Sequence, residues 1–229
     1  FEYACELCCQ VVSALRVAHE QGIVHRDLKP ANIIVVHPEP DQPRAKVLDF
    51  GIACRLSSER TRSDGRVFGT PSYMAPEQVR SARNVDERSD VWAVAVVLFE
   101  LCTGRPPFDA EKLLASGLDE MRRILREVEP VRPSTALSTL AMNDATMLAK
   151  ARKMSVPGLA SLVRGDLDWI VMKALEKDRA RRYETANALA MDVRCYLREE
   201  LVLARPPSRR YRLRKLVRRN RIVFVAGGI

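Results

Sequence analysis

A short hairpin flanked by polar residues is the feature that most constrains how this chain can fold. Residues 33–36 and 45–48 are largely apolar and short enough to be strands, and the proline-rich segment 37–43 between them indicates a turn. Asn32 directly precedes the first strand and Asp49 directly follows the second, so antiparallel pairing places both at one end of the hairpin. Side-chain oxygens of this kind are the ligands that Mg²⁺ prefers. The hairpin therefore predicts a metal-binding pair whose members lie seventeen positions apart.

The loop before this hairpin contains groups suited to phosphate chemistry. The segment 25–32 reads His-Arg-Asp-Leu-Lys-Pro-Ala-Asn. The carboxylate of Asp27 can accept a proton from a hydroxyl group, and Lys29 is near enough in the chain to neutralise charge on a transferring phosphate. Together with Asn32 and Asp49, these residues predict metal-assisted phosphoryl transfer.

These segments resemble two motifs of the eukaryotic-type (Hanks-type) serine/threonine protein kinases. The segment 25–32 is similar to the catalytic loop of that family, and Asp-Phe-Gly at 49–51 is similar to its metal-binding motif. Lysine at position 29, followed by proline, resembles the serine/threonine branch. Ala-Pro-Glu at 75–77 resembles the end of the family's activation segment. The resemblance extends over residues 1–200, and its layout is similar to that of bacterial transmembrane serine/threonine kinases.

The resemblance implies a mainly α fold, namely the helical C-lobe of a protein kinase with a short β-hairpin that carries the catalytic and metal-binding loops. The N-lobe, which grips ATP, is expected to be absent. The ten glycines include no G-x-G-x-x-G phosphate loop, and no strand lysine of the V-A-I-K type precedes His25. Residues 1–200 are therefore expected to be the C-lobe of a kinase domain. The chain is expected to be a fragment of a longer protein, and the fragment by itself is expected to be inactive.

The resemblance also implies a cofactor and a site. Mg-ATP is the expected phosphate donor, and serine or threonine hydroxyls of proteins are the expected acceptors. Asp27 would orient and deprotonate the acceptor, and Lys29 would contact the phosphate of ATP. Asn32 and Asp49 would hold the metal. Thr70 is expected to bond to Asp27 and Lys29, as the corresponding threonine does in the family.

Other residues that the resemblance singles out have structural or regulatory roles. Glu77 and Arg182 are expected to form a buried ion pair. Asp90 is expected to accept backbone N–H groups from the turn at 25–26. Arg26 would bind a phosphate in the activation segment, and Asp64 could stand in for that phosphate. The candidate phosphosites are Ser57, Ser58, Thr61 and Ser63.

Apolar residues at helical spacing predict the remaining elements. The segment 91–101 is apolar on nearly every side, which is typical of a helix in the centre of a domain, and it is too short to span a bilayer. The long connection 130–165 is expected to be a solvated insertion around a helix at 140–153. Cys5-x-x-Cys8 lacks a second pair of zinc ligands, so buried reduced thiols are expected there. Further helices are predicted over 2–20, 113–128, 167–175 and 189–197.

The C-terminal end differs from the body in charge. The formal net charge is +9, and residues 205–221 contain nine Lys and Arg but no acid, whereas residues 1–204 are balanced. A terminal basic run outside a neutral body argues against a nucleic-acid-binding protein. Residues 222–229 are uncharged, and positive charge beside an apolar segment is typical of the cytosolic side of a membrane helix. The alternative is a disordered tail with a chance apolar end.

Three parts are therefore expected: a kinase body at 1–200, a basic juxtamembrane linker at 201–221, and the start of a transmembrane helix at 222–229. The expected protein is a single-pass membrane kinase whose lobe is cytoplasmic, with a homodimer as one route of signalling. A pseudokinase scaffold and a small-molecule phosphotransferase are the alternatives. The three residues that a pseudokinase normally loses are present, and the segment 75–77 argues against the small-molecule enzymes.

Overall fold

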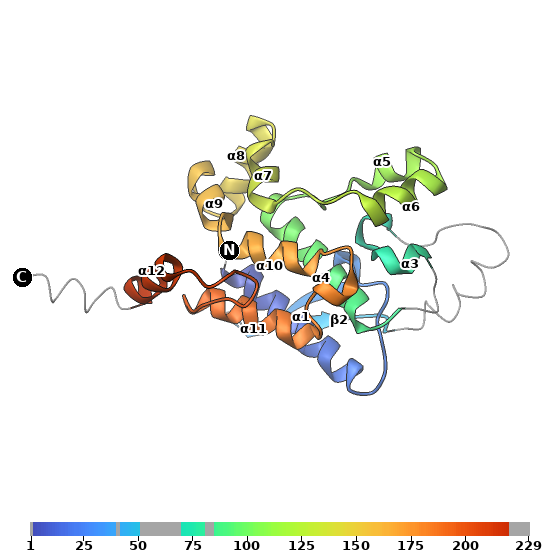
Figure 1. Cartoon of the computed structure of the whole chain (residues 1–229), viewed down its shortest axis with the longest axis horizontal. Coiled ribbons are helices and arrows are strands. Elements are labelled where there is room, and N and C mark those ends of the chain that lie inside the picture. The colour runs from blue at the N-terminus through green and yellow to red at the C-terminus, as the bar shows by residue number, and fades with distance from the viewer. Residues whose placement is uncertain (1, 40–41, 51–69, 81–84, 220–229) are drawn as a thin grey trace, which may run out of the picture.

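The computed structural model describes residues 2–39, 42–50, 70–80 and 85–219 (Figure 1). Helices dominate this part of the chain, and its strands form one two-stranded antiparallel sheet. The mainly α architecture with a β-hairpin is as the sequence predicts.

The first helix, α1 (Glu2–His19), lies along α11 (Ala186–Leu197), although almost the whole chain separates the two. Its inner face buries Cys5, Cys8 and Leu15 in the core. The helix is followed by Gly22 in a left-handed conformation (φ 71°), which turns the chain toward the catalytic loop.

The hairpin consists of β1 (Ile33–Glu39) and β2 (Gln42–Val47), and Ile33 pairs with Val47. Both strands extend into the segment 37–43, so the prediction that this whole segment is a turn is wrong. Prolines 38 and 43 lie within strands. A two-stranded sheet has only edge strands, and an edge strand tolerates a residue without an N–H donor.

The central helix is α4 (Glu87–Thr103). It begins at an N-cap, Asp86, whose side chain accepts from Arg88 N, and it ends at Gly104 with φ 80°. Trp92 and Phe99 are fully enclosed among α1, α10 and α11. The helix is therefore buried on nearly all sides, as its apolar sequence predicts.

Two helices, α5 (Ala110–Ala115) and α6 (Leu118–Glu127), replace the single helix predicted over 113–128. Gly117 adopts φ 82° between them, a left-handed conformation that ends a helix. The α6 helix packs beside the short helix α3 (Pro76–Arg80).

The connection 130–165 is not the solvated insertion that the sequence suggested. It forms α7 (Pro133–Ser138), α8 (Met142–Ala151) and α9 (Val156–Val163), and α8 agrees with the predicted helix. Leu137, Leu159 and Val163 are buried, because α7 packs on α4 and α9 packs on α7 and α10. The connection therefore contributes to the core.

The last two helices of the body and one beyond it complete the fold. The helices α10 (Asp166–Ala174) and α11 match their predicted positions. The segment predicted to be the basic linker contains α12 (Arg209–Arg219), which lies at the opposite end of the molecule from α3, α5 and α6 (Figure 1).

Candidate active site

The open end of the hairpin brings the two expected metal ligands together. A 3-10 turn, η1 (Pro30–Asn32), leads into β1, and the N–H of Leu48 donates to the carbonyl of Asn32 at 2.9 Å. Asp49 follows Leu48 directly and is exposed, whereas Asn32 is buried. The backbone therefore places a fixed amide beside an accessible carboxylate.

Asp27, Lys29 and Asn32 form one cluster. The ammonium of Lys29 lies 2.8 Å from Oδ2 of Asp27, and both side chains are partly exposed. Nδ2 of Asn32 donates to the carbonyl of Asp27 at 2.8 Å. Because the amide nitrogen of Asn32 is used within the loop, its Oδ1 is left to act as a ligand.

Asp90, near the start of α4, holds this loop through hydrogen bonds to its backbone. Its carboxylate is fully buried at the start of α4 and accepts from the N–H of His25 at 2.9 Å and of Arg26 at 2.8 Å. This is the contact that the sequence predicts for Asp90. His19 adds a second contact that sequence reasoning missed, with Nε2 2.7 Å from Oδ2 of Asp90. The only signal for it was the position of a histidine in the last turn of the first helix.

His25 links the loop to the hairpin. Its Nε2 lies 2.8 Å from the carbonyl of Leu48, and its Nδ1 lies 3.3 Å from the N–H of Asp27. A carbonyl can only accept, so these contacts fit a neutral ring with its proton on Nε2. The ring also packs against Phe50 with centroids 5.1 Å apart. His25 is thus a structural core residue.

Backbone strain concentrates at this site. Arg26 has φ 67° and Asp49 has φ 58°, values that residues with a side chain seldom adopt. Such conformations cost roughly 1–3 kcal/mol each and persist where surrounding contacts enforce them. The contacts of Asp90 and His25 do this for the catalytic loop.

Gln78 is a further residue that sequence reasoning missed. Its Nε2 donates to the carbonyl of Arg26 at 2.6 Å, and its Oε1 accepts from the N–H of Ala75 at 2.8 Å. The side chain therefore ties the end of the activation segment to the catalytic loop.

Glu77 and Arg182 form the expected ion pair. Two nitrogens of Arg182 donate to the two carboxylate oxygens of Glu77 at 2.8 and 2.9 Å, and Ser89 Oγ donates to Oε1 at 2.7 Å. Burial by itself raises the pKa of Glu77, but the hydrogen bonds and charge of Arg182 outweigh it and lower the pKa below its ordinary value. This pair fastens α3 to the turn before α11.

The part of the activation segment just before residues 75–77 is held by a different pair. Tyr73, in the 3-10 turn η2 (Pro71–Tyr73), donates its hydroxyl to Glu100 on α4 at 2.6 Å. Burial and this bond to Glu100 raise the pKa of Tyr73. Thr70 precedes the turn, but within the described part of the chain its hydroxyl makes no bond to Asp27 or Lys29. The expected threonine contact is not formed in this structure.

Several expected regulatory residues lie outside the described residues. They are the glycine of the segment 49–51, Ser57, Ser58, Thr61, Ser63 and Asp64. The segment 222–229 lies outside them as well. None of the helices within the described ranges has the length and apolarity needed to cross a membrane.

The cysteines of α1 belong to the core. Burial raises the pKa of Cys5 to about 12 and, despite the nearby Arg194, that of Cys9 to about 11. Cys5, Cys8 and Cys9 are free thiols. Thiols with such pKa values are poor metal ligands and poor nucleophiles at neutral pH.

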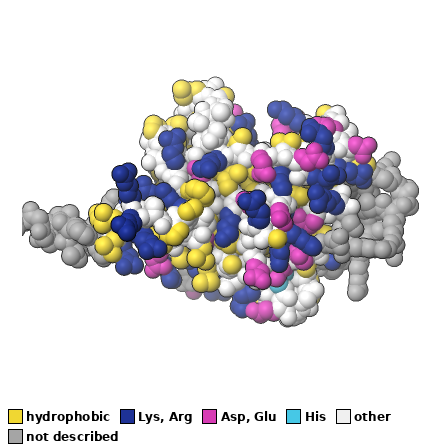
Figure 2. All heavy atoms as spheres, viewed as in Figure 1, with side chains coloured by type: hydrophobic (Ala, Val, Ile, Leu, Met, Phe, Trp, Pro, Cys, Tyr) yellow, Lys and Arg dark blue, Asp and Glu magenta, His cyan; other side chains and the backbone are white. Residues whose placement is uncertain are grey.

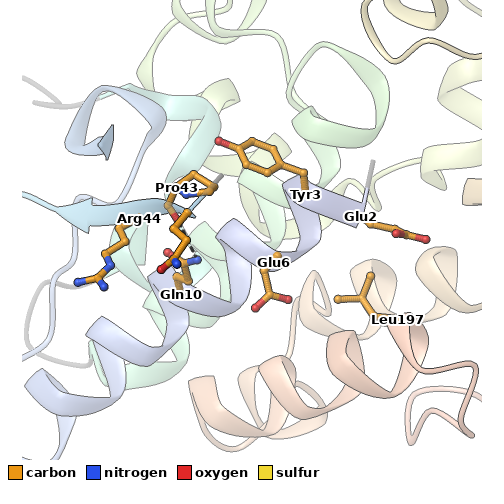
Figure 3. Close-up of a pocket in the computed structure, with 8 residues that line it drawn as sticks. Glu2, Tyr3, Glu6, Gln10, Pro43, Arg44 and Leu197 are labelled. Atoms are coloured by element: carbon orange, nitrogen blue, oxygen red, sulfur yellow. Dashed lines mark hydrogen bonds between the residues drawn. The ribbon is translucent and has the colours of Figure 1, made fainter. Parts of the chain in front are cut away.

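An open pocket lies between α1 and β2, away from the catalytic loop (Figure 3). Gln10, one of its lining residues, joins α1 to β2 by donating to the carbonyl of Pro43 at 3.2 Å and accepting from the N–H of Ala45 at 2.8 Å. Its lining contains none of the expected catalytic residues. The pocket is therefore a feature of the helix–hairpin junction.

Known proteins match most of this chain. The family model described as the protein kinase domain matches residues 2–193. A probable serine/threonine-protein kinase of Corynebacterium efficiens, CE0033, is 37% identical over 185 residues, which cover 80% of this chain and 24% of that protein. PrkC of Bacillus subtilis is 36% identical over 185 residues, which cover 81% of this chain and 24% of that protein. The chain thus spans about a quarter of the length of these curated relatives.

A solved structure shares the fold. The kinase domain of Mycobacterium tuberculosis PknI, in a double-mutant form, matches with a TM-score of 0.53 at 24% identity, over 85% of this chain and 54% of that chain. A kinase-like lobe requires three features that this structure has. They are the loop held by Asp90, the paired end of the hairpin and the Glu77–Arg182 ion pair. With the family match over residues 2–193, they show that this chain belongs to the protein kinase domain family, among relatives that include bacterial serine/threonine kinases.

Proposed function

We propose that this chain supplies the catalytic groups with which a serine/threonine protein kinase transfers phosphate from Mg-ATP to a hydroxyl of a protein. The observation that carries the proposal is the cluster at the end of the hairpin, where Lys29 lies 2.8 Å from Asp27 and the amide of Asn32 bonds to the same loop. The names of the relatives, serine/threonine-protein kinases, support the choice of acceptor.

The residues present fit the proposed cofactor. Oδ1 of Asn32 and the carboxylate of Asp49 are hard oxygen donors, and Mg²⁺ is usually held by one or two such groups together with phosphate oxygens. Asp49 is exposed and can meet a nucleotide that arrives from solvent. When bound, Mg²⁺ neutralises charge on the phosphates of ATP.

Asp27 and Lys29 then have separate tasks. Asp27 accepts the proton of the acceptor hydroxyl as the new oxygen–phosphorus bond forms and the bond to the leaving ADP oxygen breaks. Lys29 places positive charge beside the transferring group, and its partly exposed ammonium needs only a side-chain rotation to turn from Asp27 toward phosphate. Asp90 and His25 hold the loop and do not take part in proton transfer.

We also propose that the described fold is the C-lobe of the kinase and that a second lobe closes over the nucleotide. Ile34 and Leu48 are 45% and 38% exposed beside the metal-ligand end of the hairpin, and such apolar side chains suit a packed interface. The match to 54% of the PknI kinase domain supports the same division. Without that second lobe, turnover is expected to be absent.

The location that we propose is the cytoplasmic face of a membrane. The basic segment 205–221 directly before the uncharged segment 222–229 supports a single membrane helix that begins there. Pairing of two copies side by side in the same membrane is the proposed route by which a signal reaches the lobe. Arg26 is the proposed receptor for a phosphate on the activation segment.

The test of the function replaces Asp27 in the complete gene product and measures autophosphorylation with radiolabelled ATP. Asp27→Asn is expected to lower the rate by ~10²–10⁴-fold, because it removes the general base, while ATP binding persists. Asp119→Asn is the matched control, since that side chain is 99% exposed on α6. Near-normal incorporation of radiolabelled phosphate by Asp27→Asn would contradict the proposal. An inactive wild type that binds ATP would favour a pseudokinase scaffold.

A further inference from the structure

The basic helix α12 is attached to the body by a buried carboxylate. Asp166, the first residue of α10, lies 3.0 Å from Nη1 of Arg205 and 2.8 Å from Nζ of Lys215. The Lys215 side chain is only 7% exposed, and its Nζ also lies 3.2 Å from Glu199. A lysine is rarely buried unless it is paired, so these contacts fix one face of α12 against the body.

Tyr211 strengthens the attachment one turn earlier. It is 3% exposed, and its hydroxyl accepts from the N–H of Val202 at 3.1 Å. The guanidinium of Arg205 lies 4.3 Å from the centre of its ring, within the range of a cation–π contact. Tyr211 and Lys215 are four residues apart and so share the inner face of the helix.

The chain that leads into α12 is tied down as well. The buried carboxylate of Asp192 accepts from the N–H groups of Leu203 and Ala204 at 2.6 and 2.8 Å. The hydroxyl of Ser208 then accepts from the N–H of Tyr211 at 3.2 Å at the start of the helix. The segment expected to be a linker is thus an ordered arm of the lobe.

The outer face of α12 has a different composition. Leu213, Leu216 and Val217 are 61%, 45% and 39% exposed, and their spacing puts them on one side, opposite Tyr211 and Lys215. Figure 2 shows hydrophobic and basic side chains together over this end of the molecule. The helix has no acidic residue. The exposed arginines beside the apolar row are Arg209, Arg210, Arg212, Arg214 and Arg219.

We propose that the outer face of α12 binds the surface of a membrane rich in anionic phospholipid. An apolar row bordered by arginines is the pattern of a helix that lies in the interface, with the apolar side chains among the acyl chains and the cations at the phosphates. A nucleic-acid backbone offers phosphates but nothing to receive Leu213. Because the opposite face is fixed to Asp166, binding also sets the orientation of the whole lobe on the membrane.

This inference rests on the membrane location proposed above and deepens it. It requires neither ATP nor transfer, so its failure and the failure of the kinase proposal are distinguishable. It also differs from insertion of the segment 222–229, which needs no anionic lipid.

The experiment measures sedimentation of the full 229-residue chain with phosphatidylcholine vesicles that contain or lack phosphatidylserine. We expect binding that depends on phosphatidylserine and weakens as salt is added. Changing Arg209, Arg210, Arg212 and Arg214 together to Gln is expected to weaken it by about 100-fold or more, because each basic residue near an anionic surface contributes to binding. The matched control changes four exposed basic residues elsewhere on the body to Gln, namely Arg44, Lys46, Arg105 and Lys112, and should bind like the wild type.

Two further arms separate the rival explanations. Leu213→Ser with Leu216→Ser should also weaken vesicle binding, since the apolar row would no longer enter the interface. Equal binding to both kinds of vesicle, or a control as weak as the α12 variant, would overturn the proposal. Duplex DNA that competes fully, with no effect of the serine changes, would instead show a nucleic-acid surface and overturn it too.

The docking of α12 is tested by hydrogen exchange of the same chain. Asp166→Asn is expected to speed amide exchange across α12, and Lys215→Met does the same from the other partner while preserving most of the side-chain volume. Slow exchange of α12 in both folded variants would contradict docking through the contact between Asp166 and Lys215. Either variant should keep phosphatidylserine-dependent binding, since the outer face of α12 is unchanged. Loss of vesicle binding while amide exchange in α12 stays slow would assign the lipid contact to a different surface.

Discussion

Four buried aspartates each hold a segment that lies outside the helix to which the aspartate belongs. Asp90 holds the catalytic loop, Asp168 holds the start of α7, Asp192 holds the chain at 203–204, and Asp166 holds α12. Only Asp90 could be predicted from the sequence, because it stands in a recognisable motif. The other three sit in ordinary helical patterns, and their partners are found only once the helices are packed.

The buried ion pair between Glu77 and Arg182 predicts how a single substitution changes stability. Arg182→Met should lower the free energy of unfolding by ~3–5 kcal/mol, because it leaves Glu77 buried without its partner. Urea denaturation at neutral pH measures this change. The exposed pair Glu120 and Arg123 is the control, and Glu120→Gln should leave the urea midpoint nearly unchanged.

The pair also predicts a pH dependence. The folded-state pKa of Glu77 is lowered from 4.5, so its contribution is complete above that pH and is lost as the pH falls through the folded value. The wild type should therefore lose more stability than Glu77→Gln does between neutral pH and the region below 4.5. Parallel pH profiles of the two proteins would contradict this assignment.

The helices and strands were largely predictable in position but less so in their ends. Periodicity located α1, α4, α8, α10 and α11, since each has one sustained apolar face or is apolar throughout. It merged α5 with α6 because the pattern does not show that Gly117 takes a left-handed conformation. It also treated the connection 130–165 as solvated, because short helices carry too few apolar residues to reveal a shared core.

The connection 130–165 is held to α10 by the carboxylate of Asp168. Asp168 accepts from the N–H and the hydroxyl of Ser134 at 2.9 and 2.6 Å, both within the core. Asp168→Asn should lower the free energy of unfolding by ~1.5–3 kcal/mol, because it weakens two charge-assisted hydrogen bonds. It should also speed amide exchange in α7 more than in α1.

Asp144→Asn is the control for this change, since Asp144 is an exposed residue of α8 in the same connection. A loss of stability no larger than that of the control, with unchanged exchange in α7, would mean that the connection is held by packing alone.

For the whole molecule, the sequence predicted which side chains lie together at the end of the hairpin better than it predicted how the C-terminal helix is attached. The motifs at 25–32 and 49–51 are local, and one hairpin is enough to join them. The attachment of α12 depends on ion pairs between residues about forty to fifty positions apart, such as Asp166 and Lys215. No local pattern encodes such a pairing, so the contacts of the basic segment with the body cannot be predicted from the sequence.

The most direct measurement of the central claim is the chemical identity of the phosphorylated product. The complete gene product would be incubated with radiolabelled Mg-ATP and a protein acceptor, and the labelled protein would be hydrolysed to its phosphoamino acids. Label is expected in phosphoserine and phosphothreonine, and it should be lost in Asp27→Asn and retained in Asp119→Asn. Label that appears only in a small molecule, or equal labelling by the Asp27 variant, would contradict it.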